Sequence, residues 1–170
     1  MFKNDRFKYL IDYKKHVKIA KKRLDALGDL DGKKILDLGT GAGYLPYLAK
    51  KRGAIVMGVN PEWEEFYDYI TEDLGVKTLK HTIAPLEALP FTASDKWDII
   101  TAYQCCFHKL GDGRKWGVLD WQMFLNRIFN KHLVLRGLLV IQINHPEVLE
   151  RALIDTTIRH KWSGNTVRIG

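Results

Sequence analysis

Residues 35–60 constrain the fold more than any other part of the sequence, because they read as strand, glycine turn, helix and strand. Their sequence is ILDLGTGAGYLPYLAKKRGAIVMGVN. The stretch at 54–59 is apolar with no polar alternation, which is typical of a parallel strand covered on both faces. Two parallel strands joined through a helix form a right-handed unit whose helix packs against the sheet. The segment therefore predicts an α/β protein.

The rest of the chain repeats this alternation of strands and helices. Apolar residues at three- and four-residue spacing predict an N-terminal helix over 5–27, with most of its lysines on the other face. Further helices are expected over 43–52, 61–74, 118–132 and 146–158, and further strands over 76–83, 96–103 and 138–144. No repeat, low-complexity tract or linker interrupts the pattern. The 170 residues are expected to form one domain with a doubly wound parallel sheet.

The net charge of +7 is concentrated near the N-terminus. Residues 1–34 contain eleven Lys or Arg against five Asp, so the other 136 residues carry a net charge of only +1. We interpret this basic segment as a solvated helix face, because it has no Arg cluster with interleaved stacking aromatic residues. A surface for nucleic acid is the alternative interpretation.

Three observations bear on compartment and metal content. No apolar run reaches about 18 residues, and the N-terminus has no apolar signal core, so we expect a cytoplasmic protein with no membrane partner. The adjacent Cys105 and Cys106 give neither a disulfide framework nor a zinc site, and we expect them to stay reduced. The six histidines lack metal-ligand spacing, so no metal site is expected.

The glycine turn has the pattern D-x-G-x-G-x-G, formed by Asp37, Gly39, Gly41 and Gly43 at the carboxyl end of the first strand. Glycines allow a sharp turn and a close approach of a ligand to main-chain N–H groups. A dinucleotide site needs a third glycine where this chain has Tyr44, so nicotinamide and flavin cofactors are disfavoured. A carboxylate at Asp37 suits a cationic ligand better than a diphosphate.

Together with the segment ALPFTASDKWDIITAY at 88–103, the glycine turn resembles the class I S-adenosylmethionine-dependent methyltransferases. The resemblance runs from Lys33 to Asn144, about two-thirds of the chain. It implies a Rossmann-like sheet with strand order 3-2-1-4-5. We divide the single domain into a basic N-terminal helix at 1–30, a cofactor-binding core at 33–144 and a shortened C-terminal region at 145–170.

The resemblance also implies how S-adenosylmethionine would be held. The glycine turn and its acid would contact the methionine part, the end of the second strand the ribose, and the segment before LPF the adenine. The N-terminal helix would cover the cofactor as a lid. The implied cofactor contacts are Asp37, Gly39, Thr40, Gly41, Gly43, Asn60, Ala84, Leu86, Glu87 and Tyr103.

Three features depart from the family pattern. Asn60 stands where the family usually has an acid, so we expect weakened ribose binding and tighter binding in Asn60→Asp. Pro85 stands where an Asp often contacts the adenine amino group. The eleven residues at 160–170 fit one short strand instead of two. We expect a shortened sheet whose edge a second copy of the chain covers, giving a homodimer.

The chain following the fourth strand supplies the candidate catalytic residues. Tyr103, Gln104 and His108 lie at the end of the sheet where the methyl group would be. His108 is the best candidate for a general base, because imidazole titrates near neutral pH, although packing against Phe107 is an alternative use. His145 is a weaker candidate, since QINHP does not match the N-P-P-Y type of sequence found in methyltransferases of nucleic-acid bases.

Trp116 and Trp121 are candidates for lining an acceptor pocket, with core packing as the alternative for Trp121 on its helix. The sequence contains no large inserted recognition domain. We therefore expect S-adenosylmethionine-dependent methyl transfer to a small-molecule or saccharide-type acceptor. The alternatives are an RNA or DNA methyltransferase that uses the basic helix, and a binding protein that kept the fold without turnover.

Overall fold

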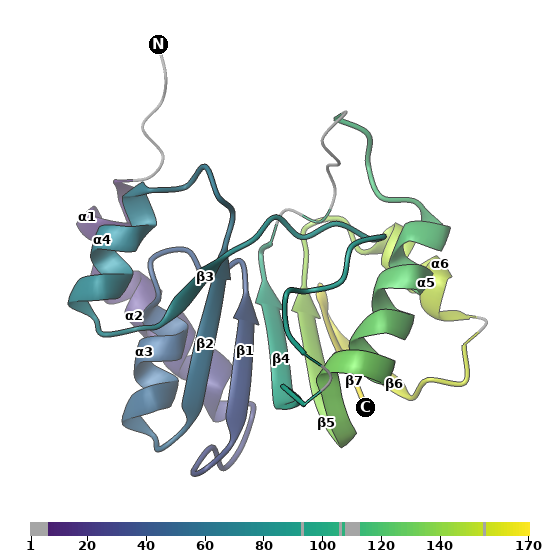
Figure 1. Cartoon of the computed structure of the whole chain (residues 1–170), viewed down its shortest axis with the longest axis horizontal. Coiled ribbons are helices and arrows are strands. Elements are labelled where there is room, and N and C mark those ends of the chain that lie inside the picture. The colour runs from purple at the N-terminus through teal and green to yellow at the C-terminus, as the bar shows by residue number, and fades with distance from the viewer. Residues whose placement is uncertain (1–6, 93, 106, 108–112, 155) are drawn as a thin grey trace.

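The computed structural model contains one seven-stranded sheet with helices on both faces (Figure 1). It describes residues 7–92, 94–105, 107, 113–154 and 156–170. The strands are β1 Lys34–Leu38, β2 Ile55–Asn60, β3 Thr78–Lys80, β4 Trp97–Tyr103, β5 Leu133–Gln142, β6 His160–Ser163 and β7 Thr166–Ile169. Their order is β3-β2-β1-β4-β5-β7-β6, and β1 to β5 are parallel. The predicted doubly wound fold and the order 3-2-1-4-5 are confirmed.

The helices form two groups, one on each side of the molecule in Figure 1. They are α1 Lys8–Ile11, α2 Tyr13–Asp25, α3 Tyr44–Lys51, α4 Phe66–Asp73, α5 Val118–Arg127 with a π-helical extension η1 at Ile128–His132, and α6 Glu147–Ile154. Helices α2 and α3 bury Leu24 and Ala49 in one core with Ile35 of β1. Helices α5 and α6 bury Leu125 and Leu149 in the larger core on the opposite face. Within the described ranges, no helix has the length and apolar character that a bilayer crossing needs.

Several predicted boundaries are wrong in instructive ways. The helix expected over 61–74 begins only at Phe66. The preceding residues are tied to the end of β3 instead, because the Glu62 carboxylate accepts hydrogen bonds from the backbone N–H and the hydroxyl of Thr82. The helix expected over 5–27 is split into α1 and α2, and the strand expected over 138–144 starts earlier, at Leu133. Tertiary contacts decide these boundaries.

The prediction of a single C-terminal strand is wrong. Strands β6 and β7 form an antiparallel hairpin in which Ser163 pairs with Thr166 across Gly164 and Asn165. Gly164 has φ of 58°, which a two-residue hairpin turn requires at its first position. Strand β7 pairs with β5, so the hairpin of the same chain covers the edge on which the homodimer expectation rested. Four-residue strands fit into a tail that had looked too short for two.

Candidate functional site

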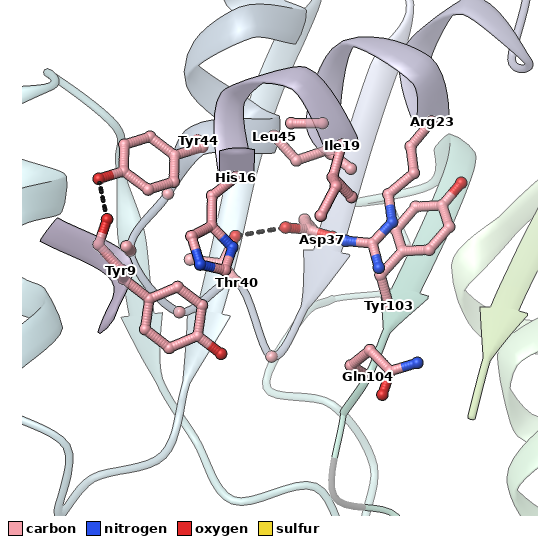
Figure 2. A pocket seen from close by; sticks show the side chains of 15 residues that line it. Tyr9, His16, Ile19, Arg23, Asp37, Thr40, Tyr44, Leu45, Tyr103 and Gln104 are labelled. Carbon is pink, nitrogen blue, oxygen red and sulfur yellow. Dashed lines mark hydrogen bonds between the residues drawn. The ribbon is translucent and has the colours of Figure 1, made fainter. Parts of the chain in front are cut away.

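A cavity of about 240 Å³ lies between α2 and the glycine turn, at the carboxyl ends of β1 and β4 (Figure 2). Parallel sheets of this kind bind ligands at this edge, where the strand order reverses. Six of the predicted cofactor contacts line the cavity: Asp37, Gly39, Thr40, Gly41, Gly43 and Tyr103. The predicted catalytic residue Gln104 lines it as well. Helix α2 covers the cavity, in the place implied for a lid.

Asp37 is the electrostatic centre of this cavity. Its carboxylate is buried, and its two oxygens accept hydrogen bonds from the hydroxyls of Thr40 at 2.5 Å and Thr101 at 2.6 Å. Burial raises the pKa of Asp37, while the two hydroxyls and the nearby Arg23 guanidinium act in the opposite direction. The hydroxyls fix the carboxylate in place, and a cation bound beside it would favour the ionised form.

The glycine turn places its backbone close to the strand ends. The N–H groups of Gly39 and Thr40 both donate to the Val59 carbonyl, at 2.9 and 3.0 Å. Gly39 has φ of 69°, and a Cβ there would lie 2.8 Å from the Cys105 sulfur, so a larger residue does not fit. Gly41 has φ of 55° and open space where a Cβ would be. A ligand therefore has room to approach the backbone at Gly41.

Asn60 supports the turn from behind. Its side-chain oxygen accepts from the Gly41 N–H at 2.8 Å, and its NH₂ donates to the Gly41 carbonyl at 3.2 Å. The residue is 1% exposed and does not line the cavity. The amide thus pairs with both backbone polar groups of Gly41, which a carboxylate cannot do because it has no donor. The two hydrogen bonds to Gly41 explain the amide at a position where the methyltransferases that the sequence resembles usually have an acid.

Arg23 is a site residue that the sequence analysis missed. Its guanidinium donates to Gln142 Oε1 at 2.5 Å and lies over the Tyr103 ring, 4.3 Å from the centroid. Burial lowers the pKa of Arg23. The sequence did contain a signal for Arg23, because this residue follows His16 and Ala20 at helical spacing on the face that α2 turns inward. An arginine on the inward face of an amphipathic helix indicates a buried partner or a ligand.

Tyr103 serves as the wall against which Arg23 packs. Burial raises the pKa of Tyr103 to about 12. A phenol with this pKa stays protonated at neutral pH, so the raised pKa disfavours Tyr103 as a general base.

Tyr9, in α1, closes one side of the cavity through a contact with Tyr44. The Tyr44 hydroxyl donates to the Tyr9 carbonyl at 2.8 Å, as the dashed line in Figure 2 shows. The Tyr9 ring lies 4.6 Å from the His16 ring, centroid to centroid. The tyrosine that argued against a dinucleotide therefore anchors the N-terminal segment over the turn.

A second cavity, of about 230 Å³, adjoins the first at the carboxyl ends of β4 and β5. Gln104 is the only described residue that lines both cavities. Trp116 and Trp121, the two candidates for an acceptor pocket, both line the second cavity, and both are also buried in the core. Asn144 and His145 also line the second cavity.

The remaining predicted residues lie elsewhere. Ala84, Leu86 and Glu87 line neither cavity and belong to the loop between β3 and β4, where Leu86 is 61% exposed. His108 falls outside the described residues. Among the residues that the structure describes, no three His, Cys, Asp or Glu side chains gather into a metal site.

Neither the scan against protein-family models nor the search of curated proteins gives a match. Solved structures do match. A TehB-like SAM-dependent methyltransferase from Corynebacterium glutamicum aligns with a TM-score of 0.65 and 17% identity, over 97% of this chain and 95% of its own. The chain has the class I methyltransferase fold. A SAM-dependent methyltransferase from Aquifex aeolicus has this fold too, with a TM-score of 0.58, 20% identity and coverage of 88% of this chain and 87% of its own.

Larger proteins contain the same methyltransferase fold. Phosphoethanolamine N-methyltransferase 1 from Haemonchus contortus, in complex with phosphoethanolamine and S-adenosylhomocysteine, aligns with a TM-score of 0.58 and 14% identity. The match covers 76% of the present chain but only 26% of the Haemonchus chain. At these identities the shared property is the fold.

Proposed function

We propose that the protein binds S-adenosylmethionine in the first cavity and transfers its methyl group to a small-molecule acceptor in the second. The observation that carries the proposal is Asp37, a buried carboxylate fixed by two hydroxyls beside a glycine turn with open space at Gly41. This arrangement suits a cationic ligand at the edge of a sheet with the methyltransferase fold.

The described residues fit the amino-acid part of the cofactor. When bound, S-adenosylmethionine supplies a methyl group on a positively charged sulfur. The Asp37 carboxylate gives the cavity a negative potential that favours such a cation. The Arg23 guanidinium is the matching cation for the carboxylate of the methionine part. Its contacts with Gln142 and Tyr103 hold it at the cavity wall before any ligand arrives.

For the ribose and the adenine, we propose contacts with Glu62 and with the loop between β3 and β4. With the Asn60 amide engaged by Gly41, Glu62 is the acid next to the end of β2 and is proposed for the ribose. Its exposed carboxylate is already oriented by Thr82, and hydrogen bonding from Thr82 lowers the pKa of Glu62. The exposed side chain of Leu86 offers apolar surface for the adenine ring, with Ala84 and Glu87 beside it.

Calorimetry with S-adenosylmethionine and S-adenosylhomocysteine tests the proposal. We expect saturable binding of both, and the absence of binding at sub-millimolar concentration would contradict it. Gly41→Leu should abolish binding, because its side chain fills the open space in the cavity. Gly164→Leu is the matched control. It has a similar φ of 58° and similar open space, but it lies in the C-terminal hairpin.

An RNA methyltransferase is the second candidate, favoured by two basic surfaces that meet. The lysines of α2 that face solvent are Lys14, Lys15, Lys18, Lys21 and Lys22. A shallow groove lined by Arg136, Arg159, Lys161 and Arg168 joins the end of this helix, where Arg168 donates to the Ala26 carbonyl at 2.5 Å. Binding of a generic RNA whose affinity falls steeply with salt would support this candidate. An affinity that does not change with salt would remove it.

A further inference from the structure

We infer that the second cavity binds a small, single-ring aromatic molecule that carries a negative charge and an oxygen able to accept a hydrogen bond. That this molecule is the methyl acceptor rests on the proposed function above. As the acceptor, its nucleophilic oxygen forms the new bond to the methyl carbon, while the C–S electron pair stays on sulfur. The proton of that oxygen passes to water.

The walls of the second cavity favour a flat apolar body. Phe107, Trp116 and Trp121 line it and are 2%, 3% and 3% exposed. Their ring centroids are 5.0 to 5.2 Å apart, so the three rings form one rigid cluster. Ile143, directly after β5, and Val148, in α6, add aliphatic surface. Aromatic walls of this kind bind another ring by stacked or edge-to-face contact.

Trp116 contributes an unused hydrogen-bond donor. The indole N–H is buried, and among the described residues it has no hydrogen-bond partner. An indole nitrogen donates only, so its partner must be an acceptor atom such as a ligand oxygen. A buried donor without a partner is costly to the folded protein, and buried polar groups in proteins are normally paired. A cation at this position is disfavoured, because the N–H is the positive edge of the ring.

The volume of the cavity suits a ligand of one ring. An apolar cavity of about 150 Å³ in an engineered protein holds benzene. The second cavity, at about 230 Å³, has room for one ring with small substituents.

The polar residues of the cavity select the charge. Gln104, Lys115, Asn144 and His145 supply its polar groups, and none of the described lining residues is an Asp or Glu. Lys115 is exposed, which places its ammonium toward solvent, where it favours an anionic substituent on the ligand. With Lys115 and no carboxylate among the described lining residues, an amine is disfavoured.

Gln104 connects this cavity to the cofactor cavity. It is a non-glycine residue with φ of 62°, and its backbone N–H donates to the Gln142 carbonyl at 2.8 Å. A residue held in the left-handed region costs free energy, and such strain gathers at functional sites. The strained backbone places Gln104 between the two cavities, where a ligand in one adjoins a ligand in the other.

Calorimetry with three related probes tests the inference: 4-hydroxybenzoate, its neutral amide 4-hydroxybenzamide, and the amine tyramine. We expect 4-hydroxybenzoate to bind most tightly and tyramine most weakly. Trp116→Phe keeps an aromatic ring but removes the N–H, and should weaken 4-hydroxybenzoate about tenfold. Lys115→Met should remove the preference for the acid over the amide.

Trp97→Phe is the matched control, because Trp97 is also buried with an indole N–H that no described residue pairs with, but it lies outside the cavity. It should leave the affinity for 4-hydroxybenzoate unchanged. The inference is overturned if no probe binds saturably, if tyramine binds most tightly, or if Trp116→Phe and Trp97→Phe behave alike.

The two proposals fail separately. Gly41→Leu should lose S-adenosylhomocysteine and still bind 4-hydroxybenzoate, because Gly41 does not line the second cavity. If the aromatic probe binds but the cofactor never does, the cavity inference stands and the proposed function falls. If the cofactor binds and no aromatic probe does, the inference alone is wrong.

Discussion

At the scale of single residues, Asn60 links the end of β2 to the glycine turn through both polar atoms of its amide. An aspartate at this position keeps an acceptor for the Gly41 N–H, but its second oxygen faces the Gly41 carbonyl. The sequence alone favoured tighter cofactor binding in Asn60→Asp, and the geometry reverses this expectation.

We therefore predict that Asn60→Asp lowers the free energy of unfolding by about 1–3 kcal/mol, the usual effect of leaving a buried polar group unpaired. Affinity for S-adenosylhomocysteine should fall with it. Urea denaturation and calorimetry measure the two effects. Asn126→Asp, on the exposed side of α5, is the control and should change neither. Tighter binding in Asn60→Asp would show that the amide does substitute for the ribose-binding acid.

Arg23 gives a second prediction at this scale. Arg23→Met should weaken S-adenosylhomocysteine about tenfold, because it removes the cation proposed for the carboxylate of the amino-acid part. Binding of 5′-methylthioadenosine, which lacks that part, should be unchanged. Calorimetry with both compounds separates the two cases. An equal loss for both compounds would mean that Arg23 only supports the packing of Tyr103.

At the scale of elements, the sequence predicted the strands and helices well and their ends less well. The apolar strands and the glycine turn were readable because burial on both faces and positive φ leave direct marks in the sequence. The late start of α4 was not readable, because it depends on the bond between Glu62 and Thr82, which are distant in sequence. The C-terminal hairpin was readable in principle from Gly164, but its four-residue strands show too little alternation.

Burial of His132 in the π-helical turn η1 predicts that the stability of the fold depends on pH. This histidine is 1% exposed and packs near Phe91, and burial first, then Lys131, Arg127 and Lys96, lower its pKa. Its unfolded-state pKa is near 6.5, so in acid the unfolded chain binds a proton that the folded protein resists. The contribution of His132 to stability is therefore full above about pH 6.5 and is lost as the pH falls below it.

Urea denaturation between pH 5 and 7.5 checks this prediction. The free energy of unfolding should decrease toward acid with a slope from this residue of at most about 1.4 kcal/mol per pH unit. His132→Phe should flatten this part of the profile, whereas His160→Gln, at an exposed position, should retain it. A profile unchanged by His132→Phe would show that another group titrates.

At the scale of the whole molecule, the two cavities belong to different halves of the sheet. The first is covered by α2 on one face, and the second lies beside the α5 and α6 core on the other. The first was predictable where its lining residues follow one another along the glycine turn, at Asp37 and 39–45. The second was only partly predictable, because Phe107, Trp116 and Ile143 meet through packing and share no sequence pattern. Arg23 and Gln142 likewise meet across 119 positions of the chain.

This separation predicts that the two ligands stabilise the protein together and do not compete. A ligand at one hundred times its Kd stabilises the folded state by about 2.7 kcal/mol, which for a chain of this size raises Tm by about 5–10 °C. S-adenosylhomocysteine and 4-hydroxybenzoate, each at this excess, should therefore give a combined shift close to the sum of the two. Differential scanning calorimetry measures all three shifts. Gly41→Leu should lose only the cofactor shift, and Trp116→Phe should reduce only the aromatic one. A combined shift no greater than the larger single shift would mean that both ligands occupy one site, which contradicts two adjoining cavities that share Gln104.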